Sequence, residues 1–164
     1  MQPRWLAEAR KHVGEREIKG RRHNPLILRW WISIRAPFTD DETPWCAAFV
    51  GGVLESCGVR SSRSAAARSY SNWGVALARP APGAIIVFWR GAPSSANGHV
   101  GFLAGEDARG NLLVLGGNQG DQVSIRPFDR ARLIGCRWPE REPLPRSAPL
   151  PRLSTNAALS THEA

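Results

Sequence analysis

The sequence predicts an α+β fold in which helices come first and an antiparallel sheet follows. Up to residue 77, apolar residues recur at helical spacing, whereas beyond Gly83 short β-rich runs alternate with turn residues. This order of elements is typical of α+β domains. From Pro139 the composition changes to Pro, Ser and Arg without an apolar period. We therefore expect one folded domain over residues 1–138 and a disordered tail over residues 139–164.

Turn residues delimit the expected elements. Asn24-Pro25 opens a helix that Pro37 ends, and Gly14 and Gly58 are natural helix stops. The expected helices are residues 4–13, the segment that Asn24 opens, residues 44–57 and residues 65–77. The antiparallel sheet is expected to have about five strands, over residues 84–89, 99–106, 111–117, 122–127 and 133–138.

Composition narrows the classes of partner. The formal net charge of +8 suggests an anionic partner, such as nucleic acid, an acidic cell-envelope polymer or lipid headgroups. The basic residues are spread along the chain without a nucleic-acid-binding motif, so we expect no nucleic acid. The three cysteines form neither a metal spacing nor an even disulfide set, and no metal or cofactor is expected. We see neither a signal peptide nor a stretch long enough to span a membrane, so we expect synthesis in the cytoplasm.

Cys46 is the candidate nucleophile. Thr43 is a good N-cap residue and Pro44 suits the first helical position, which makes Trp45 the second and Cys46 the third residue of the expected helix. A cysteine there faces unpaired backbone N–H groups and the positive end of the helix dipole, and both favour the thiolate. The alternative is that Cys46 is a small buried hydrophobe.

His99 is the candidate base, because it alone of the four histidines begins an expected strand. If the following hairpin turns between residues 108 and 109, His99 stands opposite Asn118, with their Cβ atoms about 5 Å apart. The Asn118 oxygen could then accept a hydrogen bond from the imidazole and orient it. A slip of one residue would bring Gln119 or Gly117 there instead. The alternative is a strand-edge histidine that is satisfied by the backbone.

Four stretches, in the family's order, resemble the NlpC/P60 and CHAP cysteine peptidases. The likeness is closest to a bacterial and phage subfamily of peptidoglycan hydrolases, or endolysins. The stretches are DETPWCAAFV at 41–50, GAIIVFW at 83–89, GHVGF at 98–102 and GGNQ at 116–119. The resemblance implies a papain-like fold that packs the cysteine helix on a sheet bearing the histidine. It also implies cleavage of an amide bond in the peptide part of peptidoglycan.

Carried over to this chain, the resemblance matches Cys46 with the nucleophile, His99 with the base and Asn118 with the third polar residue. It leaves open whether the enzyme is an amidase or an endopeptidase. Two alternatives remain, a non-catalytic cell-wall-binding module on the same fold and an interbacterial amidase toxin. The expected partner is peptidoglycan, the expected state a monomer, and the expected site of action the cell wall or periplasm after release or export.

The residues around the cysteine and histidine are candidates for substrate binding. Asp41 and Glu42 either bind a cationic group of the wall peptide or form an acidic flank that complements the helix dipole. Trp45 and Trp89 either line the cleft or pack in the core. Gln119 completes this candidate set.

Overall fold

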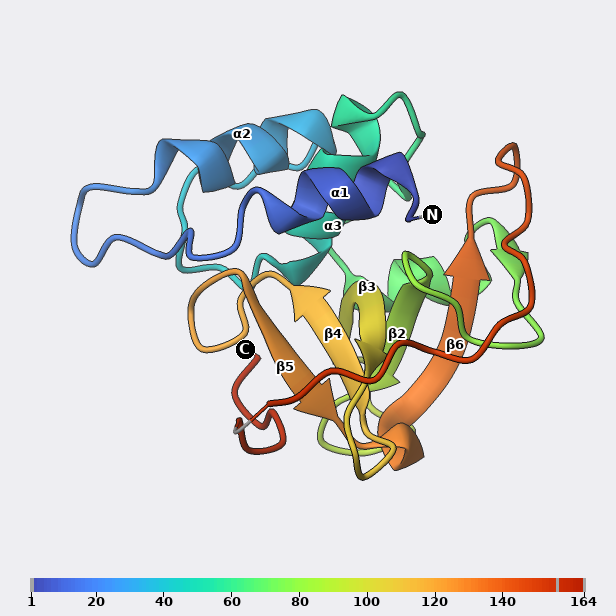
Figure 1. The fold of residues 1–164 in the computed structure, drawn as a ribbon. Helices are drawn as coiled ribbons and strands as arrows, with labels where there is room; N and C mark the ends of the chain where they lie inside the picture. The colour runs from blue at the N-terminus through green and yellow to red at the C-terminus, as the bar shows by residue number, and fades with distance from the viewer. Residues whose placement is uncertain (1, 156, 164) are drawn as a thin grey trace.

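The computed structural model, which describes residues 2–155 and 157–163, confirms the α+β fold (Figure 1). Helices α1 (Arg4–Arg10), α2 (Pro25–Ser33) and α3 (Cys46–Ser56) lie together beside an antiparallel sheet. The strand order across the sheet is β1-β6-β2-β3-β4-β5. The strands span Val75–Ala76 (β1), Ile85–Trp89 (β2), Gly98–Glu106 (β3), Leu112–Gly116 (β4), Ser124–Phe128 (β5) and Leu133–Trp138 (β6), with 3₁₀ turns η1 (Ala67–Asn72) and η2 (Arg130–Arg132).

The sheet has one strand more than expected, because the predicted helix over residues 65–77 is wrong. That segment forms the short turn η1 and then the strand β1, whose Val75 pairs with Trp138 of β6. Gly74 separates the two with a φ of +59°. This left-handed conformation ends the helical winding and turns the chain onto the edge of the sheet.

Helix α3 begins at Cys46, two residues later than predicted. The Asp40 carboxylate accepts hydrogen bonds from the N–H groups of Glu42 and Thr43 at 2.9 and 2.6 Å, and from the Thr43 hydroxyl at 3.0 Å. The Thr43 hydroxyl therefore closes a separate turn instead of capping the helix. Trp45 takes the cap position, and Cys46 becomes the first helical residue.

Phe49 joins the helical layer to the sheet. Its ring is fully buried, and its centroid lies 5.0 Å from that of Trp30 in α2 and 5.9 Å from that of Phe102 in β3. Burying an aromatic ring of this size contributes on the order of 2–3 kcal/mol to folding. The first turn of α3 is thereby held against β3, the strand that carries His99.

The described part of the C-terminal tail contains no helix or strand, yet it makes specific contacts along the sheet. The N–H of Glu106 donates to the carbonyl of Pro151, and the N–H of Leu153 donates to the carbonyl of Glu106, both at 2.9 Å. Further on, the N–H of Ser160 donates to the carbonyl of Pro127 in β5, also at 2.9 Å. The tail thus crosses the sheet from the side of β6 to the β5 edge (Figure 1).

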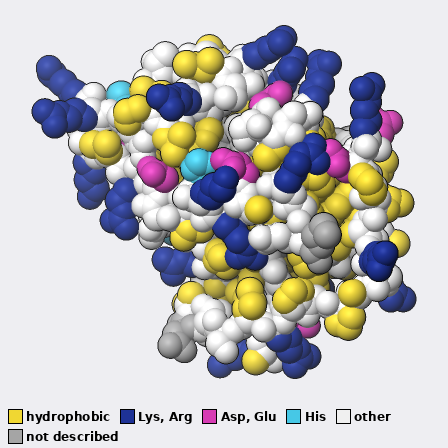
Figure 2. Space-filling model, turned by 45° about the horizontal axis from the view of Figure 1, so that its top comes forward, with side chains coloured by type: hydrophobic (Ala, Val, Ile, Leu, Met, Phe, Trp, Pro, Cys, Tyr) yellow, Lys and Arg dark blue, Asp and Glu magenta, His cyan; other side chains and the backbone are white. Residues whose placement is uncertain are grey.

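The surface carries its positive charge in many places. Lys and Arg side chains project all around the face shown in Figure 2, and acidic groups lie among them. No helix in the described part of the chain has the length and apolar character needed to cross a membrane.

Candidate active site

Cys46 lies at the junction of α3 and β3. It is 4% exposed, and the backbone N–H groups of Val100 and Ala47 face its sulfur and favour the thiolate. Burial acts in the opposite direction and dominates, so the pKa of the Cys46 thiol is raised. The lowered pKa that its place at a helix start predicts is therefore not found in this closed arrangement.

His99 is fully buried in β3, and the next residue of that strand, Val100, faces the Cys46 sulfur. Its ring stacks on Phe128 with centroids 5.1 Å apart and an interplanar angle of 6°. Burial lowers the pKa of His99 to about 4, although the hydrogen bond with Gln119 and the charge of Glu163 act to raise it. At pH 7 the imidazole is therefore neutral in this arrangement.

Gln119 determines which nitrogen of His99 carries the proton. Its Nε2 donates to the carbonyls of Val114 and Ser124 at 3.1 and 2.8 Å. The side-chain oxygen must then face His99, and it lies 2.9 Å from Nε2 of the imidazole. Because that oxygen can only accept, Nε2 of His99 is the protonated nitrogen. Nδ1 is left as the free base, and within the described residues it has no hydrogen-bond partner.

Gly116 makes room for this contact. A Cβ atom at this position would lie 2.2 Å from Oε1 of Gln119 and 3.1 Å from Nε2 of His99. Only glycine leaves space for the two side chains to meet here.

Asn118 follows β4, and within the described residues no hydrogen bond joins it to the imidazole of His99. The predicted register holds at the pair Phe102–Leu115, but β4 ends at Gly116 and Asn118 adopts a φ of +59°. The chain therefore leaves the ladder before it reaches the position opposite His99. Gln119, the next residue, reaches His99 from the loop instead. The Nδ2 of Asn118 lies 3.5 Å from the carbonyl oxygen of Glu163.

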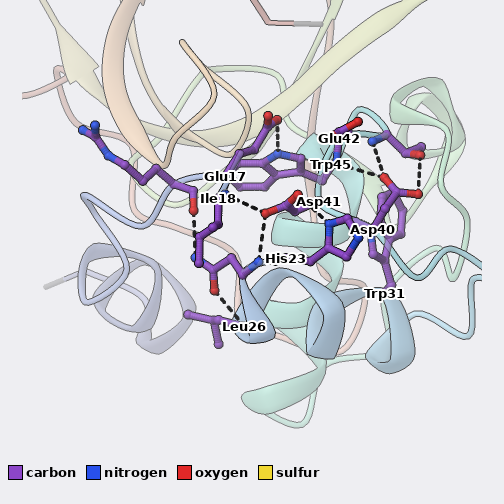
Figure 3. Close-up of polar contacts among 12 residues, drawn as sticks. Glu17, Ile18, His23, Leu26, Trp31, Asp40, Asp41, Glu42 and Trp45 are labelled. Carbon is purple, nitrogen blue, oxygen red and sulfur yellow. Dashed lines mark hydrogen bonds and ion pairs between the residues drawn. The ribbon is translucent and has the colours of Figure 1, made fainter. Parts of the chain in front are cut away.

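Asp41 is buried inside the loop before α3 (Figure 3). Its carboxylate accepts from the backbone N–H groups of Ile18 and Asn24 at 2.7 and 2.8 Å and contacts Nδ1 of His23 at 3.0 Å. Burial acts to raise the pKa of Asp41, but these donors outweigh it and hold the pKa below its usual value. The carboxylate is thus engaged by the fold, which does not favour the predicted role in substrate binding.

The remaining candidates for substrate binding lie in different surroundings. Trp45 is fully buried, stacks on Trp30 and donates its indole N–H to Glu17 at 2.9 Å (Figure 3). Trp89 is half-buried at the end of β2, where its indole N–H donates to the carbonyl of Ala131 at 3.2 Å. Glu42 is exposed. Of the two tryptophans, Trp45 therefore fits the core alternative and Trp89 remains near the surface.

Three charged residues near His99 were not singled out from the sequence. Arg90 follows β2, Arg132 ends η2, and Glu163 belongs to the tail. Nothing in their sequence context separates these arginines from the other basic residues. The tail likewise lacks the apolar period that signals packing.

Part of the chain matches a known family model. Residues 38–118 match the family model described as the CHAP domain, which confirms the resemblance to the NlpC/P60 and CHAP superfamily. CHAP domains are typically hydrolases that act on peptidoglycan. No curated protein matches the chain. Among residues 2–155 and 157–163, no group of three or more His, Cys, Asp or Glu side chains could hold a metal ion.

Proposed function

Because residues 38–118 match the CHAP domain model, we propose that the chain is a cysteine-dependent peptidoglycan hydrolase that cleaves an amide bond of the wall peptide. One observation carries the proposal. Gln119 fixes the proton on Nε2 of His99, which leaves Nδ1 as a base on the strand whose next residue, Val100, faces the Cys46 sulfur. The expected site of action is the cell wall, which the enzyme reaches after release or export.

The chemistry begins with transfer of the Cys46 thiol proton to Nδ1 of His99. The thiolate attacks the carbonyl carbon of the scissile amide, and His99 returns the proton to the leaving amine, which gives an acyl-enzyme. Water then loses a proton to His99 and attacks the thioester, which releases the carboxylic acid and restores the thiol. The backbone N–H of Cys46, in the first turn of α3, is the candidate oxyanion donor. Gln119 acts as a positioning residue for His99.

Replacing the nucleophile tests this mechanism. Cys46→Ala is expected to reduce clearing of a suspension of purified cell walls by about 10³-fold or more, because the acyl-enzyme cannot form. Cys57→Ala, which removes a half-buried thiol at the other end of α3 from Cys46, is the matched control and should clear walls at the normal rate. Full activity in a folded Cys46→Ala protein would refute the mechanism. Mass spectrometry of the released fragments will separate amidase from endopeptidase cleavage.

A wall-binding module without catalysis is the second candidate, and the burial of Cys46 together with its raised thiol pKa favours it. Such a module would bind purified walls but release no fragments, and iodoacetamide would label Cys46 no faster than the other cysteines. A hydrolase requires Cys46 to become the most reactive of the three thiols once walls or wall peptides are added.

A further inference from the structure

The C-terminal tail places a buried acidic residue beside His99. Glu163 is 1% exposed, whereas its neighbours Thr161 and His162 are exposed. The N–H of Gly120 donates to the carbonyl of His162 at 2.9 Å, which holds the tail to the loop that carries Gln119. A charged residue is rarely buried unless its charge is paired, so the partners of Glu163 identify what this position binds.

Glu163 is bound by side chains, most of them from the folded domain. Arg132 forms an ion pair with its carboxylate, to which the hydroxyl of Ser160 also donates at 3.1 Å. The backbone carbonyl of Glu163 accepts from Nη1 of Arg90 at 3.1 Å and from Nδ2 of Asn118 at 3.5 Å. Only Ser160 comes from the tail itself. The other three donors form a cradle for a carbonyl and a nearby carboxylate.

This cradle adjoins the proposed reactive pair. The Arg132 guanidinium lies 5.5 Å from the ring centroid of Phe128, and Phe128 stacks on His99. The charge of Arg90 acts on both Cys46 and His99. A group held in the cradle is therefore held next to the atoms proposed to react.

We propose that Arg90, Arg132 and Asn118 form a substrate subsite for an acidic residue of the wall peptide, and that Glu163 occupies it as an internal competitor. The proposal rests on the proposed function, because that function supplies the peptide. A guanidinium group pairs strongly with a carboxylate and more weakly with a neutral carboxamide. The subsite should therefore prefer a free acidic residue to an amidated one.

Occupation of the subsite by the tail would also account for the closed state of the site. With Glu163 in place, Cys46 and His99 have almost no contact with solvent. A wall peptide can take the subsite only when Glu163 leaves it, so the tail and the peptide compete. Departure of the tail would admit water and relieve the burial that holds both groups neutral.

The first test weakens the internal competitor in the full-length chain. Glu163→Gln keeps the shape of the side chain but removes its charge, so it should raise kcat/KM on purified walls by about fivefold. Glu163→Asp keeps the charge and should give a smaller rise. Glu140→Gln, an exposed change in the same tail, is the matched control and should leave the rate unchanged. Equal rates in the wild type and in folded Glu163→Gln and Glu163→Asp would overturn the inference.

The second test measures binding without turnover. Calorimetry would compare an acetylated, amidated peptide of the sequence Leu-Ser-Thr-His-Glu with its Gln-ended counterpart, both added to the Cys46→Ala, Glu163→Gln protein. The Glu peptide should bind about fivefold more tightly, and adding Arg132→Gln should abolish the difference. Arg109→Gln, at an exposed arginine in the turn after β3, is the control that should preserve it. Equal binding of the two peptides would overturn the subsite.

The two tests separate this inference from the proposed function. If the chain hydrolyses no wall material, the proposed function fails, but the peptides still report on the cradle. If walls are cleared and the peptides bind equally, the hydrolase stands and the subsite fails.

Discussion

Two buried carboxylates lie near the candidate active site, and they are bound in different ways. The Asp41 carboxylate, in the loop before α3, accepts hydrogen bonds from two backbone N–H groups and contacts His23. Glu163 pairs with Arg132, and its carbonyl accepts from Arg90 and a third side chain. Backbone donors are fixed by the fold, whereas side-chain donors can serve another ligand. The Asp41 carboxylate is thus part of the folded scaffold, whereas Glu163 occupies a binding site.

The largest effect that separates the two carboxylates is on stability. Asp41→Asn replaces an acceptor that serves two backbone N–H groups, so it should lower the free energy of unfolding by about 3 kcal/mol. Glu163→Gln should lower it by about 1 kcal/mol or less, because the tail can leave while the domain stays folded. Urea unfolding measures both, with the exposed Glu42→Gln as control. Similar losses at positions 41 and 163 would contradict the distinction between scaffold and occupant.

Lowering the pH should reduce stability through His99 and through Asp41 in separate pH ranges. The folded-state pKa of His99, about 4, lies below its unfolded value of about 6.5. The unfolded state therefore binds the proton first, and stability falls as pH drops from 6.5 to 4, by up to about 3 kcal/mol. Asp41 has a lowered pKa, so its contribution is present above the ordinary carboxyl pKa and is lost only at lower pH. Urea unfolding at pH 7, 6, 5 and 4 measures the first range.

A change at Glu163 should alter how stability depends on pH, since the charge of Glu163 raises the pKa of His99. The Glu163→Gln protein should lose more stability between pH 6.5 and 4 than the wild type does. A His99→Gln protein should lose less over the same range. Identical pH slopes in all three proteins would show that His99 is not buried as a neutral imidazole.

The last of these effects concerns orientation of the base. Gln119→Leu keeps the volume of the side chain but leaves Nε2–H of His99 without its acceptor, so kcat should fall by about 10²-fold with little change in KM. Loss of this hydrogen bond should also move the acidic limb of the pH profile to lower pH, because the bond raises the pKa of His99. Asn118→Leu should instead raise KM. A normal pH profile in Gln119→Leu would leave Gln119 with a structural role only.

Much of the scaffold follows from local pattern, and much of the site does not. Strand β6 has the predicted bounds, and Gly58 with its φ of +75° ends the turn after α3 as expected. Cys46 and His99 were selected from the sequence, and the structure brings their elements together. These features depend on periodicity, turn residues and motifs, which act over a few neighbouring residues.

The rest depends on contacts between segments that are distant in sequence. Whether Asn118 or Gln119 reaches His99 is decided by where β4 ends, and a register argument assumes that the strand continues. The burial of Asp41 depends on donors from the loop between α1 and α2. Glu163 finds its partners only because two arginines and the loop after β4 already surround one place. The sequence of the tail, rich in Pro, Ser and Arg, contains no local pattern that predicts these contacts.

The anchoring of the tail at Glu106 has a consequence for the choice of substrate. Only the short segment after Leu153 needs to move for Glu163 to leave, so the competitor is tethered close to its site. A short tether gives a ligand an effective concentration on the order of millimolar. A dilute soluble fragment would rarely displace the tethered Glu163 from the subsite, whereas intact wall presents peptides at a comparable local concentration. The tail would thus act as a threshold that confines hydrolysis to assembled polymer.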